Sequence, residues 1–217
     1  MIQLTNVFKF YKTERHFKVV LDHVSTVFES GSSYALLGVN GAGKSTTLRL
    51  IAGTELPNGG KIRRTVRVSW PLGLGSVFHP LMSGRDNLHF ISRIYGADIK
   101  RVTKFVEEFA ELGDYLEAPV RTYSSGMLAR LAFGASMAVE FECYLIDESI
   151  SVGDARFQVR CAEVFSQRRK YADVIFVSHS MVLAKSYCNK GGVLVDGRLM
   201  TFNTVDEAVD MYNKLNR

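Results

Sequence analysis

The chain has 217 residues, 47% hydrophobic and 23% charged, so it has room for one compact α/β domain with a core and is not intrinsically disordered. Its formal net charge of +5 allows contact with an anionic surface, although the basic groups within residues 63–67 and 168–170 are interpreted first as solvated faces. The three cysteines are widely spaced in apolar or helical surroundings, which argues against a disulfide framework or a zinc site and predicts reduced packing residues.

No targeting or membrane-spanning segment is visible in the sequence. The first residues lack a basic stretch followed by an apolar run, so no signal peptide is predicted. The most apolar segment, 129–139, contains Arg130, is followed by Glu140 and Glu142, and falls well short of the roughly 18 apolar residues of a transmembrane helix. These features predict a cytoplasmic protein.

An N-terminal strand region runs to about Phe28, and a glycine-rich loop follows it. A short apolar strand at 34–37 leads into Gly-Val-Asn-Gly-Ala-Gly-Lys-Ser at 38–45, and apolar residues at helical spacing come next. Such a loop wraps its N–H groups around a triphosphate, with Lys44 on the outer phosphates and Ser45 on a magnesium ion. The alternative, an ordinary glycine-rich turn, does not account for the full motif. The predicted nucleotide-binding residues here are Gly38, Asn40, Gly41, Ala42, Gly43, Lys44, Ser45 and Thr46.

A helical block interrupts the nucleotide-binding core after one further strand. Alternating apolar residues around Val66 and Val68 predict that strand, which should end before Pro71. From residue 83 to about 139 the pattern is helical, most clearly over 102–112, where apolar residues recur every three or four positions. The block is therefore predicted to be an insertion into the core.

The α/β alternation resumes after this block. Residues 143–146 predict a buried strand, 154–171 a helix and 174–177 a second buried strand, as expected of parallel βαβ units. A hairpin with a type I′ turn at 196–197 follows. The last helix, 204–215, should begin with a capping box formed by Thr204 and Glu207.

Two carboxylates, Asp147 and Glu148, follow the first of these buried strands. Ligands bind beyond the C-terminal ends of strands in open α/β sheets. Asp147 is suited to hold a magnesium ion directly or through water, and Glu148 to accept a proton from the water that attacks the γ-phosphate. A surface turn is the alternative, and it is weakened because the pair and the glycine-rich loop predict each other.

A second helix start lies at the end of the helical block, where Ser124, Ser125 and Gly126 precede a helix predicted to begin at about Met127. Considered without its sequence context, this segment is interpreted as a helix cap. Its place after a helical insertion and before the Asp-Glu pair resembles the signature loop of the ATP-binding cassette (ABC) family. In that family the loop completes the nucleotide site of a partner subunit.

The resemblance spans essentially the whole chain and implies a fold, ligands and an assembly. The implied fold is a P-loop NTPase (RecA-like) core with an N-terminal antiparallel β subdomain, about 1–82 and 141–217, and an inserted α-helical subdomain, about 83–140. Tyr11 matches the aromatic residue that stacks on adenine, 151–154 the dimer-contacting loop, and His179 the histidine that contacts the γ-phosphate. ATP and Mg²⁺ are the implied ligands, bound by two copies that close head to tail.

Several short segments of the sequence are similar to those of ATP-binding subunits of capsular polysaccharide exporters. Segments 69–74, 83–88, 107–113, 123–127 and 152–157 carry this likeness. O-antigen and teichoic acid exporters share part of it, but many of them have an extra C-terminal domain. The resemblance implies ATP hydrolysis coupled to export of a lipid-linked capsular polysaccharide through a polytopic permease. It places the chain as a peripheral homodimer at the cytoplasmic face of the inner membrane, with no direct nucleic-acid contact.

One departure from the family pattern lies at 78–80, where most members have a glutamine that reaches the magnesium ion and the attacking water. His79 can still form hydrogen bonds, so it is kept as a candidate nucleotide-site residue. The segment is interpreted as a contact with the membrane subunit, and direct magnesium ligation by His79 is the alternative.

Two other classes of protein stay open. A soluble P-loop ATPase acting on nucleic acid or ribosomes would suit the basic charge, although cassette proteins of that kind usually carry two cassettes in one chain. A P-loop kinase or GTPase is less well supported, because the segment at 189–192 lacks the Asp of a guanine motif and the signature-like loop would have no role.

Overall fold

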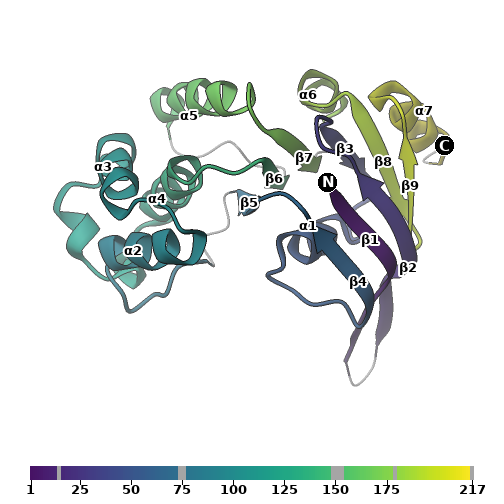
Figure 1. Ribbon diagram of the computed structural model, residues 1–217, viewed down its shortest axis with the longest axis horizontal. Helices are drawn as coiled ribbons and strands as arrows, with labels where there is room; N and C mark the ends of the chain where they lie inside the picture. Colours follow the sequence, from purple (N-terminus) through teal and green to yellow (C-terminus); the bar gives the residue numbers. More distant parts are fainter. Residues whose placement is uncertain (14–15, 73–76, 148–153, 178–179, 216–217) are drawn as a thin grey trace. The chain divides into compact units, whose positions relative to one another are not determined.

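The structure is a computed structural model that describes residues 1–13, 16–72, 77–147, 154–177 and 180–215 (Figure 1). Its strands are β1 (Ile2–Lys12), β2 (Phe17–Phe28), β3 (Tyr34–Leu37), β4 (Gly59–Arg64), β5 (Val68–Leu72), β6 (Cys143–Asp147), β7 (Asp173–Val177), β8 (Lys190–Val195) and β9 (Arg198–Phe202). Its helices are α1 (Lys44–Ala52), α2 (Gly84–Tyr95), α3 (Ile99–Ala110), α4 (Ser125–Ala138), α5 (Ala155–Arg168), α6 (Met181–Tyr187) and α7 (Val205–Leu215), with 3₁₀ turns η2 (Gly113–Glu117) and η3 (Val120–Thr122). The chain divides into two compact units: unit 1 comprises Met1–Pro71, Glu142–Glu148 and Ala172–Arg217, and unit 2 comprises Leu72–Phe141 and Ser149–Tyr171.

Unit 1 is built on a six-stranded sheet with the order β5-β6-β7-β3-β8-β9. Strand β3 is parallel to both of its neighbours, β7 and β8, and β6 is parallel to β7, whereas β8 and β9 form an antiparallel hairpin. The C-terminal ends of β3, β6 and β7 therefore meet at one edge of the sheet. This is the edge at which α/β sheets bind ligands.

Alternate residues of the central strands face two different layers. Leu36 of β3 faces a core cluster that includes Leu48 of α1 and apolar side chains of β1 and β2. On the opposite face, the Phe176 ring of β7 lies 5.4 Å from the Tyr187 ring of α6, and α7 packs on β3 and β8. The period of two along each strand thus explains why these strands are apolar on both faces.

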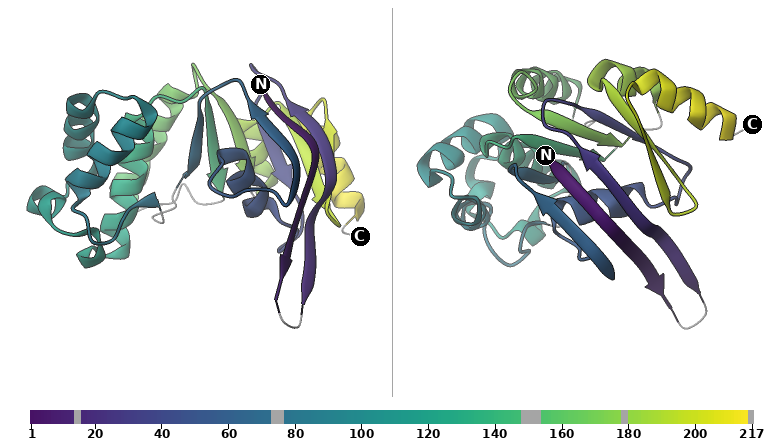
Figure 2. Two further views of the ribbon diagram at one scale, coloured as in Figure 1. Left: turned by 60° about the horizontal axis from the view of Figure 1, so that its bottom comes forward. Right: turned by 45° about the vertical axis from the view of Figure 1, so that its right-hand side comes forward.

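An antiparallel three-stranded sheet, β2-β1-β4, forms the other part of unit 1 (Figure 2). It confirms the antiparallel strand region predicted at the N-terminus. Strand β4 was not predicted, because it is joined to β1 by backbone pairing and its residues lack apolar alternation. Arg64 of β4 donates to the carbonyl oxygen of Leu50 at 2.6 Å, which ties this sheet to the last turn of α1.

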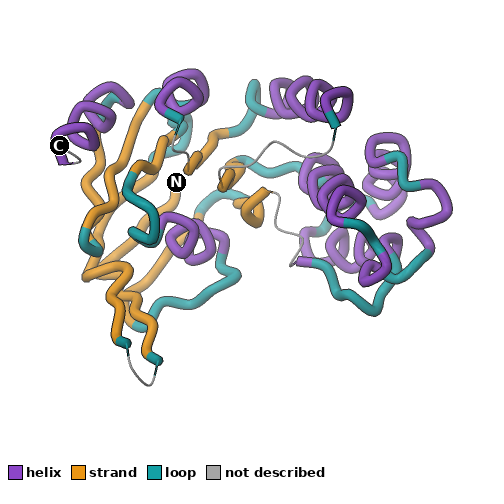
Figure 3. Tube along the Cα trace, turned by 180° about the vertical axis from the view of Figure 1, so that it is seen from behind, coloured by secondary structure: helices purple, strands orange, loops and turns teal. Residues whose placement is uncertain are grey.

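Unit 2 contains helices α2 to α5, which Figure 3 draws in purple. The Phe109 ring of α3 lies 5.8 Å from the Phe133 ring of α4 and 5.1 Å from the Phe157 ring of α5. Val106 and Val102, one and two turns before Phe109, are fully buried. This confirms the apolar helical face predicted within 102–112.

Most local predictions are confirmed, and one is wrong. Asp196 and Gly197 have φ angles of +46° and +76°, as a type I′ turn requires. The N–H of Glu207 donates to Thr204 Oγ1 at 3.2 Å, and the N–H of Thr204 donates to Glu207 Oε2 at 3.3 Å, which is the predicted capping box. Pro71 does not follow the strand but lies within β5, because β5 is an edge strand and tolerates the missing N–H.

The cysteines are free and buried, as predicted, and burial raises the pKa of the Cys143 and Cys161 thiols to about 12. Within the described ranges, no helix is long and apolar enough to cross a bilayer. The division into one domain with a helical subdomain at about 83–140 stays a prediction, since unit 2 also takes in α5.

Candidate functional site

The glycine-rich loop connects β3 to α1, and its geometry depends on two glycines. Gly43 is the N-cap of α1 with φ +107°, and a Cβ built on it would lie 2.2 Å from Val20 Cγ1 of β2. A Cβ on Gly38 would lie 2.5 Å from the carbonyl oxygen of Leu194 in β8. Because larger residues do not fit, the loop backbone runs directly against its neighbours, and α1 begins without a side-chain cap. Its first N–H groups are therefore free of a capping side chain.

The side chain of Lys44 lies inside this loop. It is only 6% exposed, and its ammonium group donates to the carbonyl oxygens of Gly38 at 2.7 Å and Val39 at 3.1 Å. The hydroxyl of Thr47 donates to the carbonyl oxygen of Gly43 at 2.9 Å and anchors the other end of the loop. A positive charge is thus held where the loop curves, which suits a bound phosphate group.

A cavity of about 300 Å³ lies over the loop within unit 1. It is lined by Tyr11, Lys18, Val20, Asn40, Gly41, Gly43, Lys44, Ser45, Thr46, Asp147 and Val177. The structure therefore brings most of the predicted nucleotide-binding residues of this unit around one cavity. Gly38 and Ala42 belong to the loop but do not line the cavity.

A hydroxyl and a carboxylate suited to a magnesium ion line the same cavity. Ser45 follows Lys44 at the start of α1, and Asp147 is the last residue of β6, paired with Val177 of β7. Hydroxyl and carboxylate oxygens are ligands that Mg²⁺ accepts, and Mg²⁺ in nucleotide sites takes its remaining ligands from phosphates and water. Among the described residues no cluster of three or more His, Cys, Asp or Glu could hold a metal by itself. The residues fit an ion that is shared with a bound phosphate.

Lys18 of β2 was not predicted as part of the site. Its ammonium group donates to the carbonyl oxygen of Gly41 at 2.7 Å, and the side chain lines the cavity. Together with Lys44 it places a second positive charge beside the loop, which favours an anionic ligand. Sequence spacing gives no signal for it, because the contact depends on how β2 pairs with β1 and crosses the loop.

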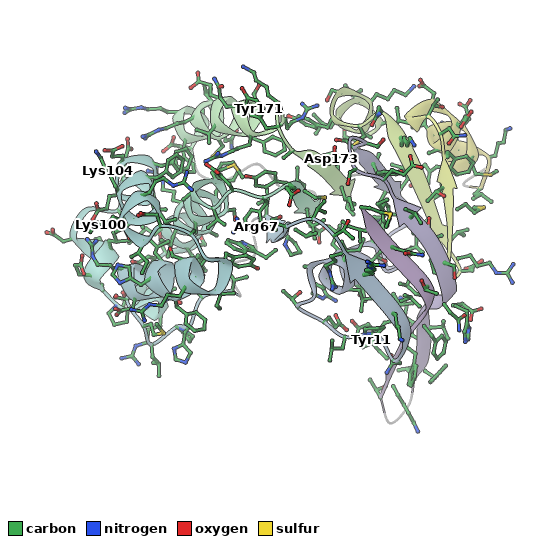
Figure 4. The ribbon with its side chains drawn as sticks, in the orientation of Figure 1. Tyr11, Arg67, Lys100, Lys104, Tyr171 and Asp173 are labelled. Atoms are coloured by element: carbon green, nitrogen blue, oxygen red, sulfur yellow. The ribbon has the colours of Figure 1, made fainter. Side chains whose placement is uncertain are left out.

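Tyr11 of β1, labelled in Figure 4, lies at the border of the cavity with 40% of its surface exposed. Its hydroxyl donates to Glu55 Oε1 at 2.5 Å, and the ammonium group of Lys9 lies 5.1 Å from the centre of its ring. Burial raises the pKa of Glu55, but hydrogen bonds from Lys9, Tyr11 and Arg49 outweigh it and lower the pKa to about 2. The tyrosine is therefore held by an ionised carboxylate.

The second predicted loop lies in unit 2 and caps a helix. Helix α4 begins at Ser125, two residues before the predicted start, and Ser124 Oγ accepts the N–H of Met127 at 3.2 Å. Ser124 and Gly126 line a cavity of about 550 Å³ together with Arg130 of the same helix. This loop belongs to unit 2, whereas the first cavity belongs to unit 1.

The other predicted site residues are His79, Glu148, His179 and the loop at 151–154. His79 is exposed in unit 2, where its backbone N–H donates to Asn87 Oδ1 at 2.7 Å. Glu148, His179 and the residues at 151–153 lie outside the described residues, so their predicted roles stay predictions. Asp154 is described, and it caps α5 by accepting the N–H of Phe157 at 2.9 Å.

A sequence profile of the family described as ABC transporter matches residues 21–151. The chain belongs to the ABC transporter family. This ABC transporter chain is 49% identical over 215 residues to the capsule polysaccharide export ATP-binding protein CtrD of Neisseria meningitidis serogroup B, covering 99% of this chain and 100% of that protein. It is 47% identical over 214 residues to the ATP-binding protein BexA of Haemophilus influenzae, covering 99% of each chain.

ABC relatives named for other polymers match at lower identity. The O-antigen export system ATP-binding protein RfbB of Klebsiella pneumoniae is 35% identical over 200 residues, covering 90% of this chain and 81% of that protein. The teichoic acids export ATP-binding protein TagH of Staphylococcus saprophyticus is 32% identical over 198 residues, covering 89% and 75%.

The ABC fold is also found among solved structures. A dimeric post-hydrolysis structure of the ATP-binding cassette MJ0796, bound to ADP and Pi, has a TM-score of 0.73 with 19% identity, covering 94% of this chain and 98% of that chain. This likeness confirms the predicted α/β P-loop fold class. The family and its relatives likewise confirm an ATPase of the ABC type.

Proposed function

We propose that the chain is the ATP-hydrolysing subunit of an ABC exporter that moves a lipid-linked capsular polysaccharide across the inner membrane. The observation that carries this proposal is the match, over essentially the full length of both chains, to a protein named for capsule polysaccharide export. The cavity with Lys44, Ser45 and Asp147 supports the nucleotide part. O-antigen and teichoic acid are the alternative cargoes, and their relatives are less similar and longer than the matched region.

Phosphoryl transfer depends on positioning and charge neutralisation more than on covalent chemistry. In this proposal the N–H groups of the loop and the ammonium of Lys44 hold the phosphates of ATP. Ser45 and Asp147 hold Mg²⁺, which supplies charge neutralisation at the phosphate oxygens when it is bound. Glu148 accepts the proton of the attacking water, and His179 contacts the γ-phosphate.

The rest of the proposal concerns assembly. Two copies close head to tail, and each offers Ser124, Ser125 and Gly126 to the nucleotide of the other. The homodimer docks on a polytopic permease at the cytoplasmic face of the inner membrane, with His79 and its neighbours at the permease contact. ATP binding and hydrolysis then drive transport because the closed and open dimers favour different permease conformations.

A Glu148→Gln variant tests the chemical assignment. It should bind ATP as the wild type does, lose nearly all hydrolysis, and accumulate as an ATP-bound dimer, because only the proton acceptor is removed. Nucleotide binding, phosphate release and size-exclusion chromatography measure these effects. Glu163→Gln, on the exposed surface of α5, is the matched control. Turnover at the wild-type rate in Glu148→Gln would remove Glu148 from its assigned role.

The cargo is tested in the source bacterium. Deletion of the coding sequence should abolish surface capsule while polysaccharide accumulates inside the cell, and the wild-type chain should restore export. A chain with Lys44→Ala should not restore it. If surface O-antigen or teichoic acid is lost while capsule persists, the alternative cargo is correct.

A further inference from the structure

A hydrogen-bonded cluster of charged and polar side chains surrounds the hydroxyl group of Tyr11 in unit 1. Its centre is the carboxylate of Glu55, in the loop after α1, which accepts Tyr11 Oη at 2.5 Å, Lys9 Nζ at 2.7 Å and Arg49 Nε at 2.9 Å. Arg49 also donates from Nη2 to Thr46 Oγ1 at 3.0 Å. The cluster thus joins β1, α1 and the loop that follows α1.

The cluster is fixed by burial as well as by its hydrogen bonds. Lys9 is 8% exposed, and its ammonium also donates to the carbonyl oxygen of Leu56 at 2.9 Å. The Glu55 side chain is 19% exposed, which limits competition from water for its oxygens. A carboxylate that accepts three donors from different elements has little freedom to move, and neither does a side chain that is bonded to it.

The ring of Tyr11, in contrast, needs an external anchor. It belongs to an exposed side chain near the end of β1, at the border of the cavity. An exposed tyrosine samples several rotamers, and a ligand that stacks on it must freeze them at a cost in affinity. The bond to Glu55 and the ammonium of Lys9 near the ring hold one orientation before any ligand arrives.

We propose that Glu55 is a positioning residue that fixes the Tyr11 ring as a preformed platform for the base of the nucleotide, while the glycine-rich loop binds its phosphates. Glu55 does not line the cavity, so it acts through Tyr11 and not by touching the nucleotide. This inference rests on the proposed function, because it assumes that the cavity binds a nucleoside triphosphate. It adds to that function the residue that presents the base platform.

Two variants separate the platform from the phosphate loop. Glu55→Gln replaces a carboxylate whose two oxygens accept three donors with a neutral amide, which keeps one acceptor oxygen and presents an NH₂ donor in place of the other. Tyr11→Phe keeps the ring and removes the hydroxyl, which donates to Glu55 at 2.5 Å, accepts from Arg49 Nη2 at 3.3 Å and lies 3.4 Å from Thr46 Oγ1. Each should weaken Mg-ATP binding by about two- to tenfold, the cost of freezing one loosened side chain, and leave binding of inorganic tripolyphosphate unchanged because that ligand has no base. The double variant should bind ATP no more weakly than the weaker single variant.

The binding measurements are made on the full chain by isothermal titration, with Glu29→Gln as the control. Glu29 forms an exposed ion pair with Lys190 in the same unit and does not line the cavity, so its loss should change neither affinity. The inference is overturned if Glu55→Gln weakens ATP and tripolyphosphate equally, which would indicate a structural role, or if Tyr11→Phe binds ATP like the wild type. A wild-type chain that binds tripolyphosphate but not ATP overturns the proposed function itself.

Discussion

The tight contact between Gly43 and β2 predicts a measurable cost for adding one methyl group to the glycine-rich loop. In Gly43→Ala the new Cβ would lie 2.2 Å from Val20 Cγ1, and the residue would have to keep φ near +107°. Holding an alanine in this positive-φ conformation costs about 1–2 kcal/mol of unfolding free energy. Overpacking against a buried side chain costs about 1–3 kcal/mol more. The sum, about 2–5 kcal/mol, is a large part of the roughly 5–15 kcal/mol that keeps a domain folded.

The two contributions are separable because the chain offers a matched glycine. Gly31 has φ +80° and nothing within 4 Å of a built Cβ, so Gly31→Ala carries the backbone strain without the clash. Urea unfolding followed by circular dichroism should show Gly31→Ala losing about 1–2 kcal/mol and Gly43→Ala about 2–5 kcal/mol. ATP affinity should fall only in Gly43→Ala, since relief of the clash moves the loop.

A double variant checks the cause. Val20→Ala shortens the side chain that the methyl group meets, so Gly43→Ala in that background should cost about 1–3 kcal/mol less than in the wild type. If Gly43→Ala is no more destabilised than Gly31→Ala, or if the Val20 change gives no rescue, the argument from the built contact is refuted.

Three other predictions concern the single side chains of Lys44, Glu55 and Ser124. Lys44→Ala should weaken ATP binding by about 10- to 100-fold in a titration, because a charge-assisted bond to phosphate is lost, and unchanged affinity would contradict this. The Glu55 pKa of about 2 lies below its ordinary 4.5, so its stabilisation, about 3 kcal/mol, is present above pH 4.5 and is lost as the pH falls towards 2. The difference in unfolding free energy between wild type and Glu55→Gln should therefore shrink over that range, and a constant difference would argue against it. Ser124→Ala should lower stability by about 1 kcal/mol and also lower ATPase activity, whereas Ser124→Asn should restore the helix cap but not the activity; full activity in Ser124→Asn would assign the hydroxyl a capping role only.

The features that were predictable from the sequence are those that one short segment encodes by itself. The loop at 38–45 follows a strand and opens a helix, and the turn at 196–197 and the box at Thr204 depend only on neighbours in the chain. Parallel pairing of β3, β6 and β7 also follows from the βαβ order, which carries Asp147 to the cavity.

The features that were missed depend on contacts between distant segments. Strand β4 is held by backbone pairing with β1, and its side chains give no periodic signal. Lys18 and Glu55 were missed because their contacts with Gly41 and Tyr11 join segments that are far apart in the sequence. One sequence signal was available for the cluster, namely a lysine at position 9 between two phenylalanines of a strand, since a charge among apolar neighbours often has a buried partner.

Strand β2 meets the glycine-rich loop at two points, through Lys18 on Gly41 and Val20 beneath Gly43. The loop is therefore packed and hydrogen-bonded by residues that lie outside its sequence motif. Two cassettes with the same glycine-rich motif but different residues in strand β2 are expected to hold that loop with different strength. Substitutions at Val20 change the packing beneath the loop and leave both cationic side chains, Lys18 and Lys44, in place.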